Sequence, residues 1–173
     1  MKINREVKKV TRRQSPSLMS IACGTENPAS IGCMFYELEG GEMAAVFTPG
    51  TLHESHKGIM HGGLSASVID EVMGRTIMHT ENREEGEEFM CMTAEMTVKY
   101  RKPVLIDKPT RAYGRIKKRD GVCIYVTADI VDEDDEILAT GEGRFIKVAK
   151  KDGEGEERSS DYLTLTEKDP KEL

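Results

Sequence analysis

The sequence has no long hydrophobic run. Its 173 residues are 38% hydrophobic and 32% charged, and every apolar stretch in it is short. A transmembrane helix needs about 20 predominantly apolar residues, so we expect no membrane span and no membrane partner. Met1 to Ser20 is basic without a continuous apolar stretch, which also argues against a secretory signal. From this length and composition we expect a single domain, located in the cytoplasm.

Positive charge is not in excess either, since the net charge is −6. A general nucleic-acid partner would require a basic surface, so none is expected. The charge is nevertheless uneven. Residues 1–22 carry six Lys or Arg against one Glu, and we interpret them as the solvated face of a helix, with an interaction arm or an organellar presequence as alternatives. Residues 149–173 are predicted to be a charged tail with a short ordered piece at 162–165, which leaves 23–148 as the folded domain.

The four cysteines follow no metal-binding pattern. Cys23, Cys33, Cys91 and Cys123 form no CxxC pair and no zinc-like spacing, so no metal site is predicted. A domain of this size needs no disulfide, and reduced thiols fit the cytoplasm. Cys23 lies near a Gly-Asn-Pro loop, yet a small buried side chain is the commoner role for a free cysteine.

The stretch from Ser55 to Thr80 contains the strongest helical pattern. Leu64, Val68 and Val72 recur every fourth residue, and a second apolar series follows one position later. This spacing predicts an amphipathic helix with a broad apolar face, enclosed by a curved sheet. Asp70 interrupts the apolar pattern, and burying a carboxylate costs several kcal/mol unless it is paired.

Two interpretations of Asp70 follow. It is either a structural acid paired with Arg75 or Lys57, or a catalytic base. Gly62 and Gly63 favour the second, because a helix start without side chains leaves backbone N–H groups open to a small anion. A free helix N-terminus and a carboxylate together suggest an oxyanion site and a base.

Geometry requires two chains for such a site. Gly62 and Asp70 are eight residues apart, which is about 12 Å along a helix at 1.5 Å per residue. Two antiparallel helices across a two-fold axis bring each N-terminus to the carboxylate of the other. The hypothesis is therefore a homodimer with two shared sites.

The remaining segments alternate as strands do. A hairpin through Gly40-Gly41, a helix and a run of antiparallel strands indicate the α+β class, with the sheet wrapped around the helix. The charged run 81–88 is predicted to be a solvated loop. The expected strands cover residues 33–38, 42–47, 89–100, 110–118, 122–130 and 136–148.

These features resemble a known family. His61-Gly62-Gly63 followed by Asp70-Glu71, the segments 93–104 and 130–145, and the Cys-Gly, Asn-Pro and Gly stretch at 23–32 are similar to hotdog-fold acyl-CoA thioesterases. The resemblance is to the phenylacetate-pathway (PaaI-like) branch of the 4-hydroxybenzoyl-CoA thioesterase superfamily. It implies the hotdog fold, an antiparallel sheet of about five to six strands wrapped around a long central helix. It also implies an acyl-CoA substrate, no cofactor, and a homodimer or dimer of dimers.

The resemblance implies roles for particular residues. Asp70 matches the acid that activates or orients the attacking water, or attacks directly in some relatives. Gly62 matches the residue whose N–H polarises the thioester carbonyl, with His61 shaping that turn, and Thr93 matches a residue that helps to hold the water. Some of these enzymes have Asn where this chain has Ser55. Ser55 or His56 supplies the second carbonyl donor, or the loop packs differently and neither does.

The substrate-binding residues are less clearly indicated. Candidates besides His56 are Gly63, Glu71, Lys99, Arg101 and Lys102. The three basic side chains either bind the phosphates of coenzyme A or are surface charges, and Glu71 is interpreted first as an ion-pair partner. The acyl group and the thiol, coenzyme A or a carrier protein, are not predicted. Acyl-thioester binding without hydrolysis is the alternative function, and a dehydratase ranks third because its His-Phe-Pro turn and helical Glu are missing.

Overall fold

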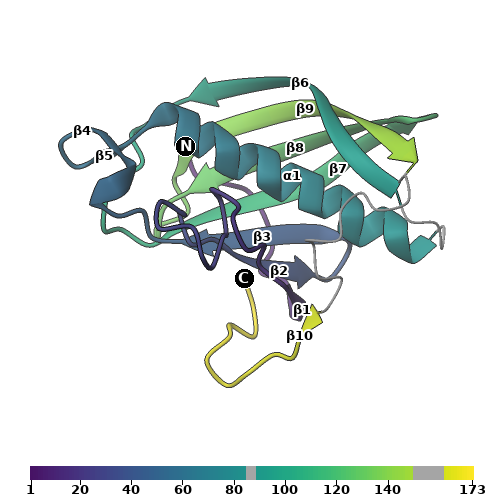
Figure 1. The fold of residues 1–173 in the computed structure, drawn as a ribbon, viewed down its shortest axis with the longest axis horizontal. Coiled ribbons are helices and arrows are strands. Elements are labelled where there is room, and N and C mark those ends of the chain that lie inside the picture. Colours follow the sequence, from purple (N-terminus) through teal and green to yellow (C-terminus); the bar gives the residue numbers. More distant parts are fainter. Residues whose placement is uncertain (85–88, 150–161) are drawn as a thin grey trace.

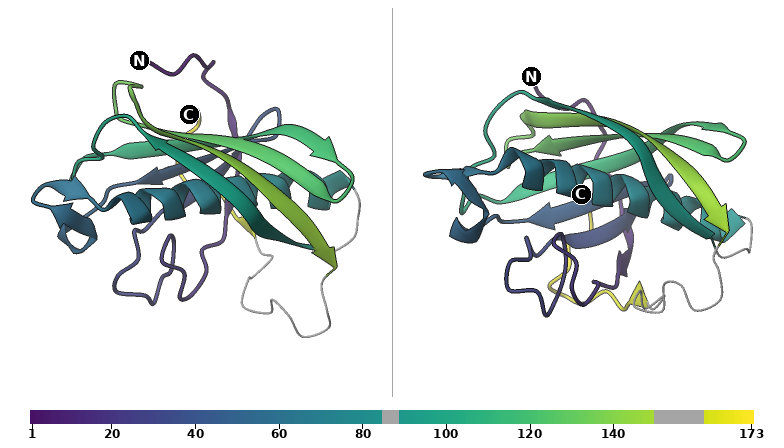
Figure 2. Two further views of the ribbon diagram at one scale, coloured as in Figure 1. Left: turned by 90° about the horizontal axis from the view of Figure 1, so that it is seen from above. Right: turned by 45° about the horizontal axis from the view of Figure 1, so that its top comes forward.

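The computed structural model describes residues 1–84, 89–149 and 162–173. One long helix, α1 (Gly62–Glu84), lies along the concave side of an eight-stranded antiparallel sheet (Figures 1 and 2). The strand order is β10-β1-β2-β3-β7-β8-β9-β6. The strands are β1 (Val10–Gln14), β2 (Met34–Leu38), β3 (Glu42–Phe47), β6 (Phe89–Tyr100), β7 (Thr110–Asp120), β8 (Cys123–Val131), β9 (Ile137–Ala149) and β10 (Tyr162–Leu163).

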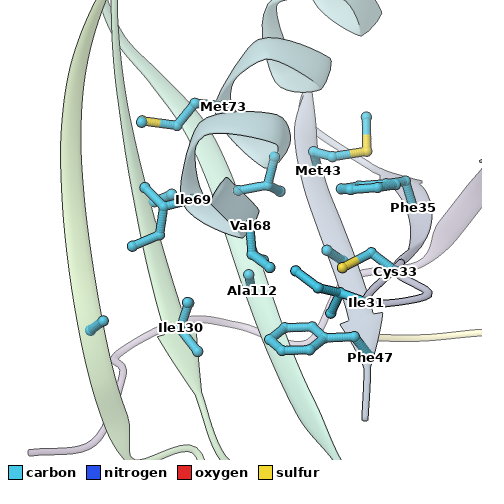
Figure 3. Packing of buried hydrophobic residues seen from close by; sticks show 14 of the residues in the cluster. Ile31, Cys33, Phe35, Met43, Phe47, Val68, Ile69, Met73, Ala112 and Ile130 are labelled. Carbon is cyan, nitrogen blue, oxygen red and sulfur yellow. The ribbon is translucent and has the colours of Figure 1, made fainter. Parts of the chain in front are cut away.

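The helix packs into the sheet through its apolar face. Val68, Ile69 and Met73 are fully buried, and Figure 3 shows them between the two halves of the curved sheet. Glycines on the strands permit this close approach. A Cβ atom on Gly114 or Gly141 would lie 2.3 Å from a side-chain atom of Thr76 or Ile69 respectively. A side chain at either glycine would push the helix away from the sheet.

The six predicted strands are all present, and the α+β hotdog architecture is confirmed. Gly40 and Gly41 have φ angles of 80° and 79°, as a tight hairpin between β2 and β3 requires. The helix continues to Glu84, so the predicted loop at 81–88 is wrong for its first four residues. The rest of that run, 85–88, lies outside the described residues.

The helical interpretation of residues 1–22 is wrong. Val10–Gln14 form strand β1, which pairs antiparallel with β2. The backbone groups of an edge strand are open to pairing, and Val10 is buried where β1 joins the sheet. Residues 15–33 contain no regular element longer than a turn.

The described part of the C-terminal segment is packed on the sheet rather than free. Strand β10 pairs with β1, so the ordered piece expected at 162–165 is a strand over its first two residues. Leu173 and Lys8 exchange two backbone hydrogen bonds of 2.8 and 2.9 Å. Asp169 is buried and accepts hydrogen bonds from the hydroxyl of Tyr36 and the backbone N–H of Thr166. No helix among the described residues combines the length and apolarity that crossing a membrane requires.

The Asp169 contacts predict an acid-sensitive attachment of the C-terminal segment. The Thr166 N–H holds the pKa of Asp169 below its usual range, so the ionised form stabilises the fold. That stabilisation is fully present above the unfolded pKa of about 4 and is lost as pH falls through the lower folded value. We expect the difference in urea unfolding free energy between wild type and Asp169→Asn to be constant near neutral pH and to shrink in acid. A difference that grew in acid would contradict this linkage.

Candidate active site

The start of helix α1 leaves one backbone donor open. His61 is the N-cap, because its Nδ1 accepts the Gly63 N–H at 3.0 Å, as capping side chains do. The His61 carbonyl accepts the N–H groups of Leu64 and Ser65 at 3.0 and 3.1 Å. Of the first four helical N–H groups, only that of Gly62 has no acceptor among the described residues. It is therefore available to an oxygen atom of a ligand.

A buried histidine, His53, forms a backbone hydrogen bond to the turn before the helix. The backbone carbonyl of His53 accepts the His61 N–H at 2.8 Å, and the Nδ1 atom of His53 accepts the Gly50 N–H at 2.9 Å. His53 is buried in the short 3-10 helix Thr51–His53. The turn before the helix is thus fixed by the backbone carbonyl of His53 and by the ring of His61, while the ring of His53 holds the preceding 3-10 helix.

Tyr100 also contacts the start of the helix, and the sequence did not indicate it as a site residue. Its hydroxyl donates to the Gly62 carbonyl at 2.9 Å. Its ring lies against the glycine, since a Cβ on Gly62 would be 3.4 Å from ring atom Cε1. The signal available in the sequence was an aromatic residue at the end of the predicted strand 89–100, three positions before Pro103.

Asp70 and Thr93 are brought together in the middle of the helix. The Thr93 hydroxyl donates to Asp70 Oδ1 at 2.6 Å. The pairing of β6 with β9 shifts register between Thr93 and Glu95, and this bulge lets Thr93 face the helix. The carboxylate of Asp70 is half-buried and forms no ion pair within residues 1–84, 89–149 and 162–173. The predicted alternative, a pair with Arg75, is wrong, because Arg75 binds Glu71 at 2.8 Å.

Four of the other predicted residues are exposed, on the hairpin before the helix or at the end of β6. Ser55 and His56 are exposed on β4 (Glu54–His56), which pairs with β5 (Ile59–Met60) in a short hairpin before the helix. Lys99 and Arg101 are exposed at the end of β6. The Nζ atom of Lys102 is 2.6 Å from Glu136, so its charge is already paired.

The apolar side chains of α1 and β6 differ in their exposure. Met73 and Ile77 are fully buried in the core, where they fill space between helix and sheet. Met92 is 53% exposed on the edge strand β6. In the described part of the chain, no group of three His, Cys, Asp or Glu side chains is arranged as a metal site.

The comparisons with known proteins agree with this geometry. Residues 57–139 match the family described as Thioesterase superfamily, a segment that includes His61, Gly62, Asp70 and Thr93. The matched segment contains helix α1 and strands β6, β7 and β8. The resemblance to hotdog-fold thioesterases is confirmed.

Among particular relatives, the Xenopus laevis protein named Acyl-coenzyme A thioesterase THEM4 is 30% identical over 120 residues, 67% of this chain. The match covers 50% of that protein, so the chain spans about half the length of the curated relative it matches. The E. coli PaaI protein from the phenylacetic acid degradation operon shares the fold with a TM-score of 0.61 and 13% identity, covering 69% of this chain and 81% of PaaI. Protein BH2602 from Bacillus halodurans, solved with CoA, has a TM-score of 0.61 and 24% identity, covering 71% of this chain and 78% of BH2602.

Proposed function

We propose that this chain hydrolyses an acyl-CoA thioester to a free acid and coenzyme A, in sites shared across a homodimer. The observation that carries the proposal is the pairing of two complementary groups on one helix. The Gly62 N–H is without an acceptor among the described residues, and the carboxylate of Asp70 is held by Thr93. The name of the Xenopus laevis relative and the CoA bound by BH2602 support this substrate class.

The chemistry assigns one role to each group. The thioester carbonyl oxygen accepts the Gly62 N–H, which stabilises the negative charge that develops there, an effect of about 10²- to 10³-fold for one oxyanion donor. Asp70 accepts a proton from a water molecule held beside the Thr93 hydroxyl, and the water oxygen attacks the carbonyl carbon. The C–O bond forms, the C–S bond breaks, and the departing sulfur takes the proton from Asp70.

The two groups act on one substrate only if they come from different chains. They are about 12 Å apart along α1, and the helix between them carries small, half-exposed residues, Ala66 and Ser67. Two copies of this face, related by a two-fold axis, present the N-terminus of one helix to Asp70 of the other. Association of two such dimers into a tetramer is compatible with this arrangement.

For the coenzyme, we propose that Lys99 and Arg101 bind phosphate oxygens. Both are exposed at the end of β6 and flank Tyr100, which contacts Gly62. Glu71 is paired with Arg75 and Lys102 with Glu136, so the proposed coenzyme site does not include these two side chains. All four cysteines are free thiols, which supports a reducing compartment such as the cytoplasm.

The shared site predicts complementation between two inactive variants. Gly62→Pro removes the open N–H at a first helical position, where proline is tolerated, and Asp70→Asn removes the base. In a mixed dimer one site carries both changes and the other carries neither. An equal mixture, unfolded and refolded together, should regain about a quarter of wild-type activity because half of the dimers are mixed.

The same experiment has a direct control. Light scattering should give at least twice the 19.3 kDa subunit mass for wild type and both variants. A mass near 19.3 kDa, or a co-refolded mixture as inactive as its components, would rule out the shared site.

A further inference from the structure

The two glycines at the helix start need external support. Gly62 and Gly63 open the helix, and glycine has more backbone freedom than any other residue. A donor that must point at a developing charge needs a fixed orientation before the substrate arrives. The sequence places flexible residues at the point where the proposed chemistry requires rigidity.

Two aromatic side chains supply that support. The His61 ring restrains Gly63 by accepting its N–H at 3.0 Å. Tyr100 restrains Gly62, because its hydroxyl donates to the Gly62 carbonyl at 2.9 Å and its ring lies against the glycine. The first turn of the helix is therefore restrained by both His61 and Tyr100.

The sheet fixes Tyr100 itself. Tyr100 pairs with Ala139 at the end of β6, and the next two N–H groups, of Arg101 and Lys102, both donate to the Leu138 carbonyl at 2.8 and 3.0 Å. The same strand carries Thr93, which holds Asp70. Strand β6 thus sets the position of both groups that the proposed reaction uses.

The exposure of Tyr100 argues against a purely structural role. Tyr100 is 57% exposed in the single chain, so it contributes little to the buried core. An aromatic ring left open beside an unpaired N–H, with its hydroxyl bonded to the adjacent carbonyl, is arranged to orient a site. We infer that Tyr100 is a positioning residue that holds the Gly62 N–H in the orientation that polarises the thioester carbonyl, an inference that rests on the proposed function.

Kinetics of Tyr100→Phe test this role, because the variant removes only the hydroxyl. Loss of one hydrogen bond that aligns the donor should lower kcat about three- to tenfold while KM changes less than twofold. The matched control is Tyr125→Phe on β8, which makes the same chemical change away from the helix and should leave kcat unaltered. Equal kcat for Tyr100→Phe and wild type would overturn the inference, as would a lower thermal midpoint with unchanged kcat.

A spectroscopic readout separates this inference from the proposed function. The carbonyl stretch of a ¹³C-labelled acyl-CoA, bound to Asp70→Asn, reports polarisation by Gly62 without turnover. The band should shift to lower frequency than in free acyl-CoA, and Tyr100→Phe added to Asp70→Asn should reverse part of the shift. An unshifted band in Asp70→Asn, or the same band in both variants, would overturn the role of Tyr100. If the wild-type protein released no coenzyme A, the proposed hydrolysis would be wrong. The carbonyl band would still test whether Tyr100 orients the Gly62 N–H.

Discussion

Asp70→Asn is expected to lower kcat by about 10²- to 10⁴-fold, the range for removal of a general base. The amide keeps the shape of the carboxylate and still accepts the Thr93 hydroxyl, but it cannot take a proton from water. Substrate binding and folding should persist, because among residues 1–84, 89–149 and 162–173 the Asp70 carboxylate forms one hydrogen bond, of 2.6 Å to Thr93, and no ion pair. Steady-state release of coenzyme A and urea unfolding measure the two effects.

A charge-matched control distinguishes chemistry from electrostatics. Glu142→Gln removes one negative charge from the outer side of β9, where the side chain is 64% exposed beside Lys117. It should change kcat by less than about twofold, since exposed pairs contribute little. If Asp70→Asn retained near-normal kcat, Asp70 would not belong to the mechanism.

Arg75→Met is expected to give the largest loss of stability, about 3–5 kcal/mol, as breaking a buried ion pair does. Arg75 is 8% exposed. Its guanidinium donates to Glu71 at 2.8 Å, to Gln14 at 3.0 Å and to Cys23 Sγ at 3.2 Å. It also lies 4.3 Å from the centre of the Phe35 ring. One side chain thus joins the helix to the N-terminal segment and to β2.

The loss should be partly reversible by a second change. Arg75→Met leaves the Glu71 carboxylate without its partner cation. That charge is costly because the Glu71 side chain is only 20% exposed. Replacing Glu71 by Met as well removes that uncompensated charge, so the double variant should be more stable than Arg75→Met alone. Lys117→Met is the surface control, and breaking its exposed pair with Glu142 should cost no more than about 1 kcal/mol. A double variant less stable than the single one would contradict this account.

The fold was predictable where side-chain periodicity is strong. Leu64, Val68 and Val72 lie on one face of α1 as expected, and the alternation predicted for 122–130 matches the buried side of β8 from Ile124 to Ile130. Val122, the first residue of that pattern, is exposed in the turn before β8. Strand β1 was missed because its sequence, VTRRQ, is mostly polar. Its place in the sheet depends on backbone pairing with β2, which composition does not indicate.

The sequence indicated which residues belong to the candidate site, but it did not indicate all of the contacts between them. The open start of the helix followed from His61-Gly62-Gly63, since glycines at a helix start leave N–H groups accessible. The contact of Thr93 with Asp70 depends on a bulge in β6, and that of Tyr100 with Gly62 depends on where the strand ends. Both are set by pairing over long distances in the chain, which local sequence patterns do not encode.

The measurement that tests thioester hydrolysis most directly is release of free coenzyme A from aromatic, short, medium and long acyl-CoA substrates by the wild-type protein. We expect at least one acyl class to be hydrolysed well above its spontaneous rate, with the activity lost in Asp70→Asn. If no acyl-CoA released coenzyme A while one of them still bound and raised the thermal midpoint, the protein would be an acyl-thioester binding module, and the proposed hydrolysis would be wrong.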